Sequence, residues 1–596
     1  MQSEQVSKQW GAVRLETGAV RFRLWASGQQ QMTLRVEGHD YPMQTAGDGW
    51  FDITLNDLPA GANYQYVLAD GTALPDPASR AQQGDVHGPS QVVDPHSYVW
   101  QYPEWQGRPW EETVVYELHI GTFTPQGTFR SAISKLPYLA ELGITQIEVM
   151  PVSQTGGKRN WGYDGVLLYA PHSAYGTPDD FKAFIDAAHG LGLSVVLDIV
   201  LNHFGPEGNY LPRLSPDFFH PDRMTPWGNG IAYDLDPVRA FIIGLPLYWL
   251  SEYRLDGLRF DAIDHIEDSR QPHVLEEIAT RIRQTITDRP IHLTTEDSRN
   301  GIDLHPRDER GQPPLFTAEW NDDLHNALHV FATGETHAYY EDFADAPEVW
   351  LARALTEGFA YQGEVSPHSG KPRGVNSRNQ PPLAFVDFIQ NHDQVGNRAQ
   401  GERLITLAGA ERTRVLLAML LLSPHIPLLF MGEEYGETHP FLFFTDFHGE
   451  LARAVREGRA KEFAGHTGHD GEDVPDPNAL TTFTASQLDW QKLTSESGKS
   501  WLRFTRQLLL LRQQAIVPLL TGAQACQGKV LHTAPGYIAV CWHFAQGTLS
   551  LALNVSDRTL PAPELPGNTL FVWPEGAGAL TPNSIIVCFA EGEACR

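Results

Sequence analysis

Four apolar stretches of this chain become polar only at their carboxyl ends, and this pattern restricts the fold more than any other feature. The stretches cover residues 195–203, 254–264, 291–297 and 383–394. A strand with apolar residues on both faces is typical of a parallel sheet covered by helices. Polar groups at the carboxyl ends of several such strands are typical of sites built on (β/α)8 barrels. We therefore expect an α/β chain whose catalytic domain is a (β/α)8 TIM barrel.

The stretch around Asp261 shows the pattern most sharply. In a strand Leu258 and Phe260 point to one face, while Arg259 and Asp261 point to the other. Two charges at adjacent inward positions are costly unless they line a polar site. This stretch alone leaves open a structural Arg–Asp pair, since buried ion pairs also occur without any chemistry. The three similar stretches favour a functional site.

Strand and helix patterns alternate after residue 114, which predicts βαβ units and a parallel sheet. One helix face is predicted over Ile133, Leu136, Leu139 and Leu142, ending at Gly143. Another helix is predicted after Thr177, with a proline at its first position. The predicted barrel strands are 114–120, 144–150, one strand at Val195, 257–261, 291–296, 315–319, 383–391 and 427–431. Long insertions at about 205–235 and 439–500 are expected, the first bordering the site.

The two ends of the chain have short alternating runs in place of βα units. Residues 1–98 predict an antiparallel β-sandwich, similar to a carbohydrate-binding module, in which packing on the barrel is favoured over glucan binding. Residues 99–515 would form the catalytic barrel with its inserted loops. Residues 516–596 return to a β pattern and predict a C-terminal β domain.

Composition restricts the classes of partner. The formal net charge is −29, from 44 basic and 73 acidic side chains, which argues against nucleic acid and anionic membranes. The first residues lack a secretory signal pattern, and no apolar run approaches the roughly 20 residues of a membrane span, so a cytoplasmic location is expected. The four cysteines, Cys526, Cys541, Cys588 and Cys595, lack metal-ligand spacing and are interpreted as mostly buried, reduced thiols.

Four ordered motifs identify a family. Asp198-x-Val-x-Asn202-His203, Gly257-x-Arg259-x-Asp261-Ala, Glu296, and Asn391-His392-Asp393 resemble the signature regions of the α-amylase superfamily, glycoside hydrolase family 13. Within it, the segments Trp161-Gly-Tyr163-Asp-Gly, Glu319-Trp320-Asn321-Asp322-Asp-Leu-His325 and Asn391-His392-Asp393-Gln394-Val-Gly-Asn-Arg398 are most similar to the maltooligosyltrehalose trehalohydrolases. The resemblance covers essentially the whole chain.

The resemblance implies catalytic roles for three carboxyl groups. Asp261 would be the nucleophile, Glu296 the acid and then the base, and Asp393 a group that binds sugar hydroxyls and stabilises the transition state. Retention of configuration requires the first two groups to lie about 5–5.5 Å apart. Arg259 is expected to keep Asp261 ionised, whereas Glu296 needs a raised pKa so that it is protonated when substrate arrives.

The resemblance also implies a set of substrate contacts. His203 and His392 would donate hydrogen bonds to the sugar at the cleavage point, and Tyr163 would stack beneath it. Residues after the sixth strand would contact substrate beyond the scissile bond. The whole expected set is Tyr163, Asp198, His203, Arg259, Asp264, Trp320, Asn321, Asp322, His325, Asn391, His392, Gln394 and Arg398.

No metal or cofactor is expected. Asn202 occupies a position at which some amylases hold calcium, but a full set of oxygen ligands is not identifiable.

The activity implied by the resemblance is hydrolysis of the α-1,4 bond next to the terminal trehalosyl unit of maltooligosyl trehalose, with trehalose as a product. Glycogen branching and isoamylase-type debranching remain alternatives, since their motifs are similar. A catalytically inactive glucan binder is disfavoured, because all three carboxyl groups are present.

Overall fold

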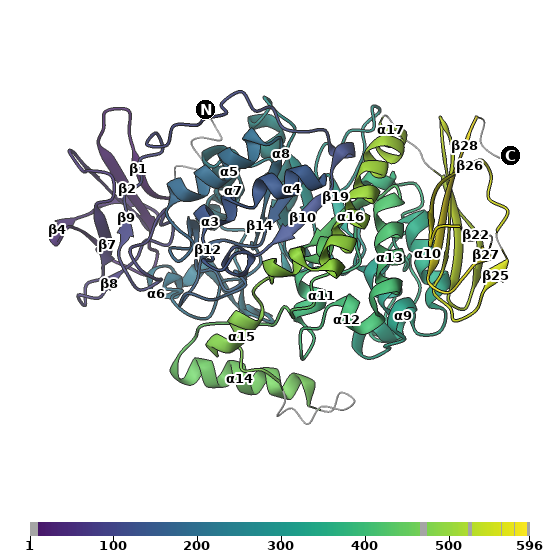
Figure 1. Cartoon of the computed structure of the whole chain (residues 1–596). Helices are drawn as coiled ribbons and strands as arrows, with labels where there is room; N and C mark the ends of the chain where they lie inside the picture. Colours follow the sequence, from purple (N-terminus) through teal and green to yellow (C-terminus); the bar gives the residue numbers. More distant parts are fainter. Residues whose placement is uncertain (1–9, 465–473, 522–526, 562, 577–578, 593–596) are drawn as a thin grey trace.

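A closed barrel of eight parallel strands forms the middle of the molecule (Figure 1). The computed structural model describes residues 10–464, 474–521, 527–561, 563–576 and 579–592. In barrel order the strands are β10 (Val115–Leu118), β11 (Gln146–Val149), β14 (Ser194–Ile199), β17 (Gly257–Phe260), β18 (His292–Thr295), β19 (Ala318–Trp320), β20 (Phe385–Phe388) and β21 (Ile426–Phe430). β21 pairs with β10 and closes the cylinder. The predicted (β/α)8 fold and its eight strands are confirmed.

The helices follow the predicted alternation, with one correction. α5 (Pro178–Gly190) begins as expected, because the Thr177 side chain accepts a hydrogen bond from the backbone N–H of Asp180. The helix predicted across Ile133–Leu142 is instead two helices, α3 (Phe129–Ile133) and α4 (Leu136–Leu142). Pro137 lies in the first turn of α4, where its missing N–H costs nothing, whereas it would break a continuous helix.

Long helices cover the outside of the barrel, and several connect consecutive strands. They are α5, α7 (Asp236–Glu252), α8 (Val274–Thr285), α9 (Asp322–Thr333), α10 (Pro347–Glu357), α13 (Ala410–Leu422) and α16 (Glu496–Leu511).

Two antiparallel sheets form the N-terminal domain, as predicted. One sheet has the order β1 (Gly11–Arg14), β2 (Val20–Trp25), β6 (Trp50–Leu55), β5 (Gln44–Gly47). The other has β4 (His39–Pro42), β3 (Thr33–Val36), β7 (Asn63–Val67), β8 (Ala73–Leu74), and β9 (Ser90–Gln91) also pairs with β7. Trp10 packs edge-on against Phe218 and Phe241, and its Nε1 donates a hydrogen bond to Pro237 O at 2.9 Å. Trp10 therefore packs on the barrel.

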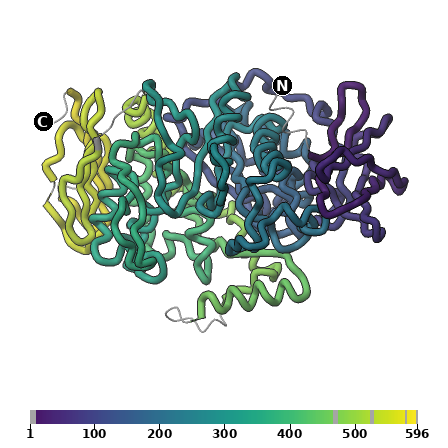
Figure 2. The backbone as a smooth tube through the Cα atoms, turned by 180° about the vertical axis from the view of Figure 1, so that it is seen from behind, coloured from purple at the N-terminus to yellow at the C-terminus, as the bar shows by residue number. Residues whose placement is uncertain are grey.

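The C-terminal domain is a five-stranded sheet at the opposite end of the molecule (Figures 1 and 2). Its order is β22 (Gln527–Ala534), β23 (Tyr537–Phe544), β24 (Gly547–Asn554), β28 (Ser584–Glu591), β26 (Asn568–Trp573). It packs on α10, where Trp542 Nε1 donates a hydrogen bond to Leu355 O at 2.9 Å. Cys541 and Cys588 are buried thiols outside any disulfide, whereas Cys526 and Cys595 lie outside the described residues.

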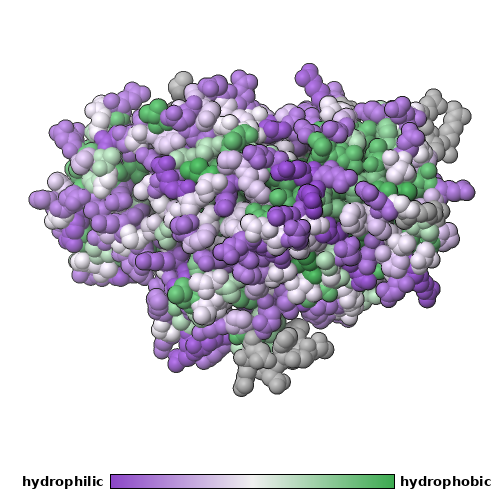
Figure 3. Space-filling view, viewed as in Figure 1, coloured by the Kyte–Doolittle hydropathy of each residue, from purple (hydrophilic) through white to green (hydrophobic). Residues whose placement is uncertain are grey.

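Both expected insertions carry secondary structure. The first contains the hairpin of β15 (Phe219–Thr225) and β16 (Gly228–Ile231). The second contains α14 (Gly449–Phe463) and α15 (Leu480–Ala485), which project from the barrel (Figure 1). The face shown in Figure 3 is largely hydrophilic, and its apolar groups gather mainly at the upper right of the view. Across the described parts of the chain, each helix is too short or too polar to cross a bilayer.

Candidate active site

Arg259 joins three carboxyl groups at the carboxyl end of the barrel. Its Nη1 donates to Asp198 Oδ2 at 2.8 Å and to Asp261 Oδ1 at 2.9 Å, and its Nη2 donates to Glu296 Oε2 at 2.7 Å. The guanidinium is fully buried. The three carboxyl groups come from the ends of β14, β17 and β18, which the register places side by side. Residues far apart in the sequence therefore share one cation.

The ring of Trp320 packs against the same guanidinium. Its ring centroid lies 4.1 Å from Arg259 Cζ, which is close enough for a cation–π interaction. Trp320 is only 2% exposed. The structure thus places Trp320 in the barrel interior, where it supports Arg259.

The residue after Asp261 has an unusual backbone. Ala262 adopts a left-handed conformation with φ 41°, which costs energy for a residue with a Cβ. This conformation lets the Ala262 N–H donate to Glu296 Oε2 at 3.1 Å. The turn after β17 therefore fixes the carboxyl group at the end of β18.

Asp393 lies at the start of α11 (His392–Gly396), directly after the loop that follows β20. The Asn391 side chain caps this helix by accepting from the Gln394 N–H at 2.9 Å. Asp393 Oδ1 is 3.7 Å from His392 Nε2. The Asp393 side chain is 35% exposed, compared with 19% for Glu296 and 11% for Asp261. The cluster therefore reaches solvent on the side of Asp393.

Burial raises the pKa of all three carboxyl groups. For Glu296, Arg259 opposes the effect of burial and the charge of Asp261 adds to it. This direction matches the expectation of a protonated acid. For Asp261, burial raises the pKa more than the neighbouring Arg259 lowers it. Arg259 thus favours ionisation of Asp261, as expected, but it does so against the larger effect of burial. The pKa of Asp393 is raised by burial despite His392.

Tyr163 forms one wall of the cluster. Its hydroxyl donates to Asp198 Oδ2 at 2.6 Å and lies 2.8 Å from His392 Nε2. Its ring stacks on the His392 ring with centroids 5.1 Å apart. Burial raises the pKa of Asp198 to about 7. Tyr163, Asp198 and His392 are therefore one connected set.

His203 lies at the same end, but both of its ring nitrogens have protein partners. They contact Asn202 Oδ1 and Tyr163 O, each at 2.8 Å. The ring of Trp227 stacks on His203 with centroids 4.4 Å apart, and Trp227 is 44% exposed. Trp227 comes from the β15–β16 hairpin and was not singled out from the sequence. The only signal for it was that its insertion was expected to border the site.

The residues predicted after the sixth strand divide into two kinds. Asn321 is buried and donates to Gly358 O and Asp387 Oδ1, while His325 is buried between Ile389 O and the Tyr340 hydroxyl. Besides Trp320, which packs on Arg259, Asp322 is the one of these residues that interacts with the carboxyl cluster. Its pKa is raised well above the usual range by burial and by the charges of Glu296 and Asp393. The side chains of Asn321 and His325 therefore make their hydrogen bonds inside the protein.

The remaining predicted contacts, Gln394, Arg398 and Asp264, each have a protein partner. Gln394 Oε1 accepts from the Tyr339 hydroxyl at 3.0 Å. Arg398 pairs with Glu335 at 2.7 Å. Asp264 Oδ2 accepts from the Ser298 hydroxyl at 2.5 Å.

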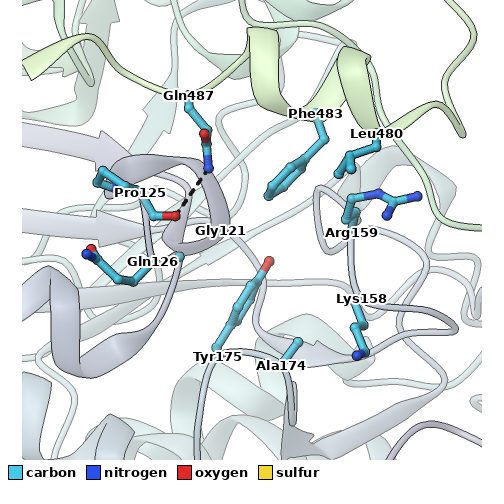
Figure 4. Close-up of a pocket in the computed structure, with 11 residues that line it drawn as sticks. Gly121, Pro125, Gln126, Lys158, Arg159, Ala174, Tyr175, Leu480, Phe483 and Gln487 are labelled. Carbon is cyan, nitrogen blue, oxygen red and sulfur yellow. Dashed lines mark hydrogen bonds between the residues drawn. The ribbon is translucent and has the colours of Figure 1, made fainter.

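A separate cavity of about 280 Å³ opens beside α15 (Figure 4). Phe483 and Tyr175 point into it from opposite sides, and Gln487 Nε2 donates to Pro125 O at 3.5 Å. Buried aromatic rings stand between this cavity and His392, through the contacts Tyr175–His119, His119–Phe441, Phe441–Trp161 and Trp161–His392. The cavity is therefore distinct from the carboxyl cluster.

Within the described ranges, no group of three or more His, Cys, Asp or Glu side chains is placed to hold a metal ion. Asn202 Nδ2 instead donates to Ala262 O at 3.3 Å.

Known proteins share this architecture and much of this sequence. The family described as "Alpha amylase, catalytic domain" matches residues 79–218. A malto-oligosyltrehalose trehalohydrolase from Deinococcus radiodurans and one from Saccharolobus solfataricus are each 40% identical, over 92% of this chain and 92% of theirs. A crystal structure from Salmonella typhimurium, which carries the provisional name alpha amylase, is 71% identical with a TM-score of 0.96, over 98% of this chain and 100% of that one. The chain belongs to the malto-oligosyltrehalose trehalohydrolase family, within the α-amylase superfamily.

Proposed function

We propose that this chain is a retaining glycoside hydrolase that releases trehalose from maltooligosyl trehalose. It would cleave the α-1,4 bond next to the terminal trehalosyl unit and leave a maltooligosaccharide. Family membership supports the substrate. The observation that carries the chemistry is the single buried guanidinium of Arg259 between Asp261 and Glu296 at an open end of the barrel.

In the proposed reaction Asp261 attacks the anomeric carbon and forms a covalent glycosyl-enzyme. Glu296 donates its proton to the departing oxygen, which leaves as the 4-hydroxyl of trehalose. Asp393 binds sugar hydroxyls and stabilises the positive charge that develops on the ring. Water, deprotonated by Glu296, then attacks the same carbon and frees the maltooligosaccharide with its configuration retained.

The electrostatics of the pair support these roles. The negative charge of Asp261 raises the pKa of Glu296, in addition to burial. Esterification of Asp261 removes that charge, so the pKa of Glu296 should fall once the intermediate has formed. The same carboxyl group can therefore give a proton in the first step and accept one in the second.

Among the expected substrate contacts, Tyr163, Asp322 and His392 have side chains at the cluster, and we propose that they line the subsite of the cleaved sugar. Trp320, Asn321 and His325 would act by holding that wall in place. We propose that Trp227, which is exposed beside His203, offers a stacking surface to the oligosaccharide. A neutral glucan suits a chain of net charge −29, because it is not repelled.

Product analysis tests the proposal directly. The protein would be incubated separately with maltooligosyl trehalose and with amylose. Free trehalose from the first, and a maltooligosaccharide that is initially the α-anomer by proton NMR, are expected. New α-1,6 branches in amylose without trehalose release would instead establish the branching alternative.

A further inference from the structure

Glu117, in the middle of β10, has no role in the chemistry described so far. Both oxygens of its carboxylate nevertheless have hydrogen-bond partners. It is completely buried. Its Oε1 accepts from the backbone N–H of His392 at 2.9 Å, and its Oε2 lies 2.7 Å from His392 Nδ1. Both oxygens therefore hold one residue, one through its main chain and one through its ring. This arrangement fixes both the position and the orientation of the imidazole.

While Asp198 is ionised, the hydrogen bonds around His392 are all satisfied only if both of its ring nitrogens carry a proton. Nδ1 faces a carboxylate oxygen, which only accepts. Nε2 faces the Tyr163 hydroxyl, whose own proton is donated to Asp198. The Tyr163 oxygen must then accept from Nε2. With Asp198 ionised, as it is at pH 8, the hydrogen bonds run from His392 through Tyr163 to Asp198, and this arrangement needs His392 to be a cation.

The charges around His392 act in the same direction. The titratable groups that interact with it are Glu117, His119, Glu148, Tyr163, Asp198, Arg259, Asp261, Glu296 and Asp393. Burial lowers the pKa of His392, but the charges of Glu117 and Asp393 outweigh it and raise the pKa to about 9. His392 in turn lowers the pKa of Asp393.

We propose that Glu117 is a positioning residue that keeps His392 cationic and aimed at Tyr163 and Asp393, and that this cationic form is the active one. This inference rests on the proposed function for its activity readout. A carboxylate that orients an imidazole and stabilises its protonated form is a known device of active sites. Here the Glu117–His392 pair is net neutral. It therefore donates an N–H to Tyr163 and fixes that side of the site without adding net positive charge near the developing cation of the sugar.

Glu117→Gln tests the proposal, because it removes the charge and keeps the shape. The variant amide can still accept from the His392 N–H and can donate to Nδ1 of a neutral ring. We expect kcat for trehalose release to fall at least tenfold at pH 8, but less than about threefold at pH 5.5, where His392 would again be protonated. KM should change much less than kcat.

The matched control is Glu148→Gln. Glu148 lies opposite Glu117 in the strand register, is equally buried, and is held protonated, since burial and the charge of Glu117 raise its pKa well above the usual range. Glu148→Gln should therefore leave the pH dependence of kcat unchanged. Glu117→Asp retains the charge and should restore most of the wild-type profile at pH 8.

NMR of ¹⁵N-histidine-labelled protein gives a readout that does not depend on turnover. The His392 signals, assigned by comparison with His392→Gln, should remain those of an imidazolium at pH 8 in the wild type and titrate at least two pH units lower in Glu117→Gln. An activity loss equal at all pH values, or a wild-type His392 that titrates near 6.5, would overturn the proposal. If the wild type released no trehalose, the proposed function would fail, and the NMR titration would still decide the role of Glu117.

Discussion

Strand β17 of the barrel and strand β24 of the C-terminal sheet are both fully buried, but their side chains differ in kind. β24 buries Leu549, Leu551 and Leu553 with uncharged neighbours, whereas β17 buries Arg259, which is surrounded by carboxyl groups from the ends of three strands. Burying charge costs free energy even when the charges are paired. We attribute the charge at the end of β17 to the proposed chemistry, and β24 shows how the same chain fills a buried strand without charge.

If this contrast holds, removing a buried carboxyl group from the site should cost activity but not stability. Glu296→Gln is expected to lower kcat by at least about 10³-fold, roughly 4 kcal/mol in the barrier, because the amide has no proton to give. The melting temperature should stay equal or rise, since one buried carboxyl group is gone. Glu276→Gln on α8 is the control and should leave both unchanged. A nearly normal rate for Glu296→Gln would remove the acid role.

The C-terminal sheet should show the opposite behaviour. Trp542→Ala removes a buried ring and its hydrogen bond to α10, and we expect a loss of about 3–5 kcal/mol in the free energy of unfolding. Urea unfolding measures it. The kcat of the folded fraction at 25 °C should stay within about twofold of wild type, and Trp542→Phe should recover most of the stability. A large drop in kcat at unchanged stability would mean that the sheet is coupled to the site.

The same contrast marks what the sequence could predict. The barrel and both sheet domains were readable from local patterns, and so was the gathering of polar groups at strand ends. The break at Pro137 was also readable, since proline cannot continue a helix. Glu117 was not, because its partner His392 lies 275 residues away in the sequence. Position after a strand end did not by itself indicate where a side chain points. Asn321 and His325 follow the sixth strand, but their side chains hydrogen-bond to backbone carbonyls inside the protein.

A smaller effect concerns pH. The pKa of Glu148 is raised in the folded protein, so its contribution to stability is complete below about pH 4.5 and is lost as the pH rises. The amide that replaces the carboxyl group in Glu148→Gln does not titrate in this pH range. The variant should therefore gain stability relative to wild type between pH 5 and 8, by at most about 1.4 kcal/mol per pH unit. Urea unfolding at several pH values checks this, and a difference that does not depend on pH would contradict it.

The smallest expected effect concerns Trp227, on the β15–β16 hairpin. Trp227→Ala should raise KM by about threefold to tenfold, as one lost stacking contact of roughly 1 kcal/mol would. The free energy of unfolding should change by less than about 0.5 kcal/mol, because Trp227 is partly exposed. Met224→Ala, 73% exposed on the same hairpin, is the control. An unchanged KM would show that the hairpin does not touch the oligosaccharide.

The sharing of Arg259 among Asp198, Asp261 and Glu296 has a consequence for any titration of this site. When one of these carboxyl groups takes up a proton, the guanidinium is freed to hold the other two more tightly, so their affinities for protons fall together. Such groups do not ionise one by one. The two limbs of a plot of rate against pH would then report macroscopic pKa values of the coupled carboxyl groups. Neither value could be assigned to a single side chain.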